Sequence, residues 1–283
     1  MIEIKPSIVE DFTFRGRRFY LKRDDLIHPL FSGNKARKFH YFFDKDLTSY
    51  QKIISHGSSQ SNAMFSLSQL AKLKKLEFDY YCSHLSSYVR DNPHGNYKMA
   101  LKNGMNIYEG EPPQIFKDNE LFVPEGGYFK EAEYGIKILA NEIEQWVKDN
   151  SKKIDIFLPS GTGTTALYLQ KNLKDIKVYT TCCVGDSEYL KKEFFGLCGD
   201  ELQHPIILNT PKKYHFAKLY KEFYEIYKEL KIAGVEFDML YDPKGWITLD
   251  IHKNSFQNDI MYIHQGGILG NITMLKRYER KYN

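Results

Sequence analysis

Short apolar runs that alternate with longer helix-like stretches are the feature of this sequence that most restricts its fold. The run from Ile154 to Leu158 is nearly all apolar, as in a strand covered on both faces. Alternation of this kind predicts an α/β protein with open parallel sheets flanked by helices. The expected strands are 18–22, 52–55, 78–82, 106–108, 154–158, 177–183 and 260–263, and the expected helices are 35–43, 62–74, 97–102, 131–148, 165–171, 187–195, 218–231 and 268–280.

The composition limits the classes of protein that remain. A length of 283 residues suffices for one or two domains. The 40 Lys and Arg against 36 Asp and Glu give a net charge of +4, too small for a nucleic-acid-coating protein. No apolar run is long enough to cross a membrane, and the first residues lack a signal-peptide pattern. The 4 cysteines form no C-x-x-C pair, so we expect a cytoplasmic protein without a disulfide framework.

The turn after the strand 154–158 has the chemistry of a phosphate site. Gly161 and Gly163 allow the backbone to approach an anion, and the helix that follows offers unpaired N–H groups. Thr162 and Thr164 add hydroxyl donors. The turn is not a Walker loop, because no Gly-Lys-Ser/Thr follows it. The plainer interpretation is a tight strand-to-helix turn with a helix cap.

A second turn rich in glycine and hydroxyl groups follows the strand 52–55 and contains Gln60, Ser61 and Asn62. It can hold a carboxylate at the start of the next helix, with Ser61 able to move a proton. Helix capping by Ser61 or Asn62 is the simpler interpretation.

Lys35 stands in the first turn of an expected helix, after Gly33 and Asn34. The positive end of the helix dipole disfavours an ammonium there and lowers its pKa. A less protonated amine is what Schiff-base chemistry needs. A solvated lysine on a basic turn is the alternative.

Taken together, these turns resemble one family. The run 32–38 (Ser-Gly-Asn-Lys-Ala-Arg-Lys) resembles the G-N-K-x-R-K motif of the pyridoxal-phosphate enzymes of the aminocyclopropane-carboxylate deaminase and D-cysteine desulfhydrase family. The runs 60–62 and 160–165 resemble its Q-S-N loop and its glycine-rich phosphate loop. The run 238–244 resembles its D-P-x-Y-x-G-K segment, and 264–267 resembles its H-T-G-G or H-L-G-G segment. The order and spacing agree over most of the chain.

The resemblance implies a two-domain α/β fold of the tryptophan synthase β-like kind, fold type II. Residues 1–45 and 146–283 would form the large domain that binds pyridoxal 5'-phosphate, and residues 46–145 a small mobile domain. The resemblance also implies a homodimer that acts on a small amino acid. The charge balance, the lack of a long apolar run and the scattered histidines lead us to expect no binding of nucleic acid, membrane or metal.

The resemblance further implies roles for single residues. Lys35 matches the Schiff-base lysine, Ser61 is a candidate acid–base group, and Tyr241 faces the substrate as a proton carrier; these are the expected catalytic residues. Asp242 falls where the family places the partner of the pyridine nitrogen. The expected cofactor-binding residues are Lys35, Lys38, Asn62, Gly161, Thr162, Gly163, Thr164 and Asp242, and the expected substrate-binding residues are Gln60, Ser61, Asn62, Tyr241 and Gln265.

The implied reaction releases ammonia and a 2-oxo acid from a small amino acid, by D-cysteine desulfhydrase-like β-elimination or by deaminase-like ring opening. Asp242 resembles the acid of deaminase-like members. Gln265 matches neither their Leu nor the hydroxyl residue of desulfhydrase-like members. The substrate therefore stays open, and β-elimination demands less of the pocket.

Other interpretations remain at this stage. A pyridoxal-phosphate-binding protein without turnover fits the departures from the motifs at Ala63, Pro243 and Gln265. A nicotinamide-dependent dehydrogenase would use the G-x-G-x-x-A pattern of 161–166, with Asp186 holding the ribose. Cys82, His84 and His94 come nearest to a metal cluster, but their spacing matches no ligand pattern, so we expect no metal.

Overall fold

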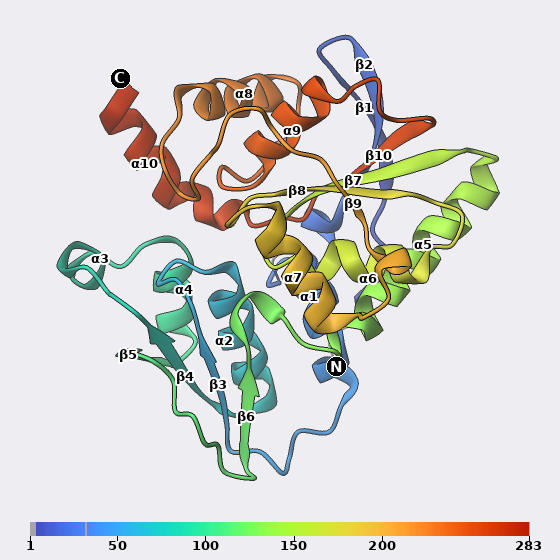
Figure 1. Ribbon diagram of the computed structural model, residues 1–283. Helices are drawn as coiled ribbons and strands as arrows, with labels where there is room; N and C mark the ends of the chain where they lie inside the picture. Colours follow the sequence, from blue (N-terminus) through green and yellow to red (C-terminus); the bar gives the residue numbers. More distant parts are fainter. Residues whose placement is uncertain (1–3, 32, 283) are drawn as a thin grey trace.

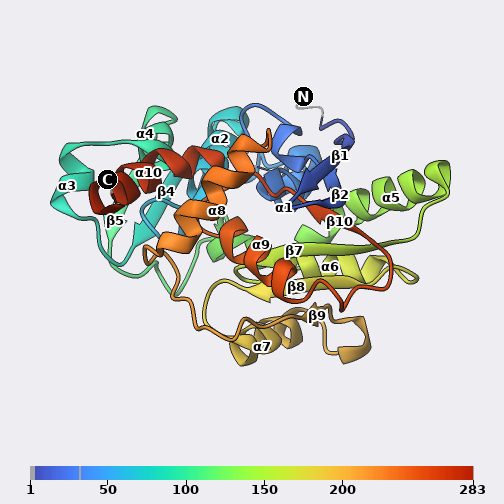
Figure 2. The same cartoon turned by 90° about the horizontal axis from the view of Figure 1, so that it is seen from above.

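The computed structural model describes residues 4–31 and 33–282, so Ser32 of the G-N-K-like run lies outside the described residues. The chain forms two β-sheets with helices packed against them (Figure 1). The small sheet and the C-terminal helix lie at one end of the molecule, and the long helix α5 lies at the other (Figures 1 and 2). Within the described part of the chain, no helix combines the length and apolar character that a bilayer crossing requires.

The larger sheet has the strand order β1-β2-β10-β7-β8-β9. All neighbouring strands are parallel except β1 and β2, which form an antiparallel hairpin at one edge. The expected parallel sheet is therefore confirmed in its centre and has one antiparallel edge strand. The strands are β1 (Val9–Phe14), β2 (Arg17–Lys22), β7 (Ile154–Ser160), β8 (Val178–Cys182), β9 (Ile206–Ile207) and β10 (Asp259–Ile263).

Strand residues alternate between two hydrophobic cores, one on each face of the larger sheet. In β7, Ile156 and Leu158 face the core under α5 (Ala132–Asn150) and α6 (Thr164–Asn172), whereas Phe157 faces the other core. In β10, Met261 faces the core under α5 and α6, and Tyr262 faces the other core. Because successive strand side chains point to opposite faces, an apolar run of this kind needs helices on both sides. The second face is covered by α8 (Lys221–Ile232) and α9 (Asp242–Ile251), and α7 (Ser187–Leu197) packs beside α6.

The smaller sheet is wholly parallel, with the order β5-β4-β3-β6. Its core lies under α2, α4 and the apolar face of α1. The elements here are α1 (Gly33–Asp44), β3 (Lys52–His56), α2 (Asn62–Lys74), β4 (Glu77–Cys82), α3 (Ser87–Asp91), α4 (Gly95–Lys102), β5 (Met105–Glu109) and β6 (Glu120–Val123); the remaining ones are α10 (Asn271–Tyr282) and the 3-10 turns η1 (Asp24–Leu26), η2 (Glu125–Gly127), η3 (Glu201–Gln203) and η4 (Ile268–Gly270).

The helix α5 bears on the proposed boundary between the two domains. The expected boundary after residue 145 falls inside α5, and α5 residues such as Ile136 and Ile143 pack in a core of the larger sheet. We therefore place the boundary before α5 rather than within it. The two-domain division itself remains a proposal.

A buried ion network fixes α1 against the larger sheet. The Arg37 guanidinium donates to both carboxylate oxygens of Asp24, at 3.1 and 2.8 Å, and to Glu142 of α5, at 2.6 and 2.8 Å. Lys22 of β2 donates to the same Glu142 carboxylate at 2.7 Å. Arg37 and Asp24 are fully buried. The opposite face of α1 packs in the small-sheet core, so this helix belongs to both halves of the molecule.

The sequence patterns do not predict β1, β6, β9, α3 and α9. The omission of α9 matters most, because Asp242 lies at its start. Pro243 and Gly245 are residue types that weaken a helical pattern in a sequence. Proline is tolerated in the first turn of a helix, where its missing N–H would have no partner. The Asp238 carboxylate accepts hydrogen bonds from the N–H groups of Leu240, Tyr241 and Asp242, and so stabilises the start of α9. Asp242 is thereby fixed at a helix start.

Candidate active site

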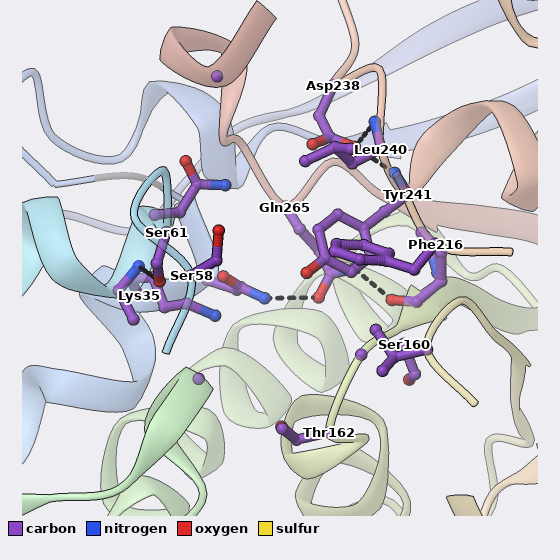
Figure 3. Close-up of a pocket in the computed structure, with 18 of the residues that line it drawn as sticks. Lys35, Ser58, Ser61, Ser160, Thr162, Phe216, Asp238, Leu240, Tyr241 and Gln265 are labelled. Carbon is purple, nitrogen blue, oxygen red and sulfur yellow. Dashed lines mark hydrogen bonds between the residues drawn. The ribbon is translucent and has the colours of Figure 1, made fainter. Parts of the chain in front are cut away.

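A cavity of about 460 Å³ lies where the turns after β3, β7 and β10 meet. Carboxyl ends of parallel strands are where ligands bind in open α/β sheets. Figure 3 shows Lys35, Ser61, Tyr241 and Gln265 around this cavity. The structure brings every residue of the expected site to its wall, although their roles remain predictions: Lys35, Lys38, Gln60, Ser61, Asn62, Gly161, Thr162, Gly163, Thr164, Tyr241, Asp242 and Gln265.

The turn after β7 forms a cradle with unsatisfied donors. Gly163 has φ +73°, and a Cβ there would meet side-chain carbons of Phe194 at 2.4 Å and Leu190 at 2.6 Å. Gly163 begins α6 without a capping side chain. The buried Thr165 hydroxyl has no hydrogen-bond partner among the described residues. Buried hydroxyls are normally paired, so this cradle has the donors and the space that a phosphate group requires.

Lys35 reaches the cavity from the first turn of α1. The turn depends on Gly33, because a Cβ there would lie 1.8 Å from the backbone oxygen of Gln265. The Asn34 N–H donates to that same oxygen at 2.9 Å. Burial lowers the pKa of Lys35 to about 8, and the charges of Asp238 and Glu125 partly offset the effect. The direction agrees with the sequence prediction, but desolvation, not the helix dipole, is its main cause.

The lowered pKa of Lys35 predicts a distinctive pH dependence in the cofactor-free protein. At pH 7 about a tenth of such an amine is neutral, against about 0.03% for an ordinary lysine. The initial rate at which borohydride-trappable pyridoxal phosphate forms on Lys35 should rise about tenfold from pH 7 and level off near pH 9. Absorbance measures the rate, with Lys35→Ala as the background for other lysines. A rate that keeps rising tenfold per pH unit up to pH 10 would contradict the lowered pKa.

Two carboxyl groups meet at the start of α9. Asp242 Oδ1 accepts from the Tyr262 hydroxyl at 2.5 Å, and Oδ2 accepts from the Asp238 N–H at 3.1 Å. Burial, and then the charge of Asp238, raises the pKa of Asp242 well above its usual range. Burial also raises the pKa of Asp238 to about 6, against the opposing effect of its bonds to backbone N–H groups. Together these groups would favour a nearby cationic nitrogen, whose charge would offset a buried carboxylate.

Tyr241 lies across the cavity from the small-sheet turn. Its ring approaches Gly161, where a Cβ would lie 3.3 Å from a ring carbon, and the Phe216 ring centroid is 5.3 Å from its own. Burial raises the pKa of the Tyr241 phenol, so the group stays protonated and can donate at neutral pH.

The small-sheet turn contributes a helix start. The Ser61 hydroxyl accepts from the N–H groups of Ala63 at 3.1 Å and Met64 at 3.4 Å, so Ser61 does cap α2. Ser61 therefore caps α2 and also lies on the cavity wall. Lys38 donates to the Gly126 carbonyl at 2.9 Å. Burial, followed by the charge of Lys35, lowers the pKa of Lys38 well below its usual range.

Gln265 has both ends of its amide engaged. Its Nε2 donates to the Pro159 carbonyl at 2.6 Å, and its Oε1 accepts from the Asn34 side chain at 2.9 Å. Gln265 therefore joins the turn before Lys35 to the turn after β7. Its expected contact with substrate remains a prediction, and this joining role was not foreseen.

Several residues at the site were missed. Asp238 stood in a quoted motif, yet its spacing alone did not show that it caps α9. Phe216 and Leu240 form apolar wall. Asn96, which contacts the small-sheet turn, gave no local signal because its partners lie 34 and 36 residues away.

The comparisons with known proteins agree with the geometry. No family model matches the chain. Two curated relatives, each named "Putative 1-aminocyclopropane-1-carboxylate deaminase", come from Thermotoga maritima (24% identity, 98% of each chain covered) and Pyrococcus furiosus (26% identity, 90% of this chain and 86% of the relative).

Solved structures match almost the whole chain. A structure described as an ACC deaminase homologue superimposes with a TM-score of 0.78 at 21% identity, covering 99% of this chain and 95% of the other. A cysteine synthase from Entamoeba histolytica gives 0.65 at 13% identity, covering 99% and 94%. A hydrogen sulfide-producing enzyme from Fusobacterium nucleatum gives 0.63 at 14% identity, covering 94% and 97%.

The superimposed structures show that the chain has the fold of the tryptophan-synthase-like, fold type II enzymes. The near-full-length relatives and the superimposed structure support the aminocyclopropane-carboxylate deaminase family, which the ordered motifs of this chain resemble. The dehydrogenase interpretation finds no support, because Asp186 caps α7 through the Tyr189 N–H at 3.0 Å and is not part of the cavity wall.

Proposed function

We propose that the chain binds pyridoxal 5'-phosphate through Lys35 and converts a small amino acid to ammonia and a 2-oxo acid. The convergence of Lys35, the phosphate-like cradle, the Asp242 carboxyl group and the Gln60–Asn62 turn on one cavity carries this proposal. When bound, the cofactor would supply an electron sink for charge that develops on the substrate.

The chain's own residues have separate tasks in this proposal. The Gly161–Thr164 turn and Lys38 would hold the phosphate group, and the Asp242 carboxyl group would pair with the ring nitrogen. The Gln60–Asn62 turn would hold the substrate carboxylate. Tyr241 and Ser61 are the candidates to move protons, and the Tyr241 phenol enters as a donor. Phe216 and Leu240 exclude water from part of the wall.

The volume and apolar wall favour a small amino acid. Between the two candidate reactions, β-elimination from D-cysteine demands less of the pocket than opening a cyclopropane ring. We also propose a homodimer, on the family resemblance alone, and a cytoplasmic location, on the cysteine usage of the sequence.

A substrate panel tests this proposal. The protein loaded with pyridoxal phosphate is offered D- and L-cysteine, D- and L-serine, and aminocyclopropane carboxylate. D-Cysteine should give hydrogen sulfide, pyruvate and ammonia in equal amounts, whereas ring opening would give 2-oxobutyrate and ammonia. Tyr241→Phe should lower kcat about 10²- to 10⁴-fold, as expected for loss of a proton carrier. Cofactor bound on Lys35 without oxo acid from any member would favour a pyridoxal-phosphate-binding protein without turnover.

A further inference from the structure

Asn96 is a buried residue of α4 whose side chain contacts the small-sheet turn. It is 1% exposed. Its Nδ2 donates to the backbone carbonyl of Gln60 at 2.9 Å and to the Asn62 side-chain oxygen Oδ1 at 2.7 Å. One amide group therefore fixes both the path of the turn and one end of the Asn62 side chain.

The close approach of α4 to this turn depends on Gly95. Its φ is +55°, and a Cβ there would lie 2.9 Å from the Thr273 hydroxyl and 3.2 Å from Gln60 Oε1. A side chain at position 95 would displace the first turn of α4 from the Gln60 turn and from α10. The absence of a side chain lets Asn96 reach both acceptors.

The contact with Asn96 decides which way the Asn62 amide faces. Because Oδ1 is held by Asn96, the donor Nδ2 must point the other way. A Cβ built on Gly267 would lie 2.6 Å from Asn62 Nδ2 and 3.6 Å from Asp238 Oδ2. The Asn62 NH₂ group is thus beside Gly267, on the side of the cavity where Asp238 lies.

We propose that Asn96 is a positioning residue that sets the orientation of the Asn62 amide, so that the cavity receives a hydrogen-bond donor and not an acceptor. The inference rests on the proposed function, because it assigns that donor to the bound cofactor and amino acid. An acceptor in the same place would repel the electron-rich oxygens of either ligand. Asn96 would act without touching the ligand.

The test replaces Asn96 by a residue of the same shape but opposite hydrogen-bonding character. In Asn96→Asp, carboxylate oxygens face Gln60 O and Asn62 Oδ1, so the Asn62 amide should turn over and present its oxygen to the cavity. The matched control is Asn103→Asp. Asn103 also joins α4 to α2, by donating to the Ser68 hydroxyl at 2.9 Å, but away from the cavity wall.

The expected result separates the two variants. Asn96→Asp should still link the cofactor to Lys35 in a form that borohydride traps. The visible absorption maximum of the bound cofactor should shift. The amino-acid concentration that gives half of the spectral change should rise about 10- to 100-fold. Asn103→Asp should match the wild type in both. Asn96→Ala, which lets Asn62 adopt either orientation, should fall between and serves if the Asp variant does not fold. Equal spectra and affinities in wild type, Asn96→Asp and Asn96→Ala would overturn the proposal, as would an equal change in Asn103→Asp.

A measurement on the cofactor-free protein keeps this proposal distinct from the proposed function. The side-chain NH₂ protons of Asn96 should exchange with solvent at least tenfold more slowly than those of an exposed asparagine, and those of Asn62 should exchange faster than those of Asn96. The opposite order would show that Asn96 does not hold Oδ1. Failure of the wild type to link the cofactor would instead refute the proposed function and leave the exchange result to decide the orientation.

Discussion

Replacing Lys35 by alanine is expected to abolish the covalent link to pyridoxal phosphate and to lower turnover by at least about 10³-fold, because no other amine among the described residues has this position on the cavity wall in the first turn of α1. Peptide mass analysis after borohydride reduction measures the link, and oxo-acid release measures turnover.

The matched control is Lys38→Met, which changes another lysine of the same helix, one whose side chain is buried. This variant should still form the link on Lys35 while binding the cofactor more weakly, because Lys38 serves the phosphate side in the proposal. A link that survives in Lys35→Ala would move the reactive amine to another residue and refute the proposed assignment.

Replacing Arg37 by methionine should cost about 3–5 kcal/mol of unfolding free energy, since it leaves the buried Asp24 carboxylate without its cation and leaves Glu142 with Lys22 alone. The melting temperature should fall on the order of 10 °C. Urea unfolding of the cofactor-free protein measures the loss. Arg15→Met is the control: Arg15 pairs with Glu229 and Asp250 at the surface, so its loss should cost only about 0–1 kcal/mol.

The Arg37–Asp24 ion pair also predicts how the stability lost in Arg37→Met depends on pH. Burial alone would raise the pKa of Asp24, but the charge and hydrogen bonds of Arg37 lower it below the usual value. A carboxyl group with a lowered folded-state pKa stabilises the fold above its ordinary pKa, about 4, and loses that contribution as pH falls through the lower value. The difference in unfolding free energy between the wild type and Arg37→Met should therefore become smaller below about pH 4. A gap that is unchanged at pH 3 would show that Asp24 does not share the cation.

Local sequence patterns predicted most of the regular structure. Apolar runs such as 154–158 gave strands, and the helix 62–74 has the bounds expected of it. The element α9 was not predicted, because it contains residue types that usually interrupt a helix. Pro243 and Gly245 masked α9, because its start is stabilised by Asp238 and not by a local pattern of its own.

The site was predictable where its chemistry is local. Turns that follow strands pointed to Gly161, Gly163 and Ser61, and a lysine at a helix start pointed to Lys35. Asn96 and the joining role of Gln265 were not predictable, because tertiary packing alone decides what those amides contact. The pKa of Lys35 was predicted in direction but not in cause, since desolvation depends on walls that distant segments supply.

The engaged amide of Gln265 limits how this scaffold can change its preference for substrates. A leucine or threonine at position 265, as family members carry, would leave the Pro159 carbonyl and the Asn34 side chain without their present partner. The turn that presents Lys35 would loosen together with the turn after β7. Any exchange of selectivity at position 265 would therefore require a compensating substitution at position 34 and another donor for the Pro159 backbone carbonyl, so positions 34 and 265 should change together.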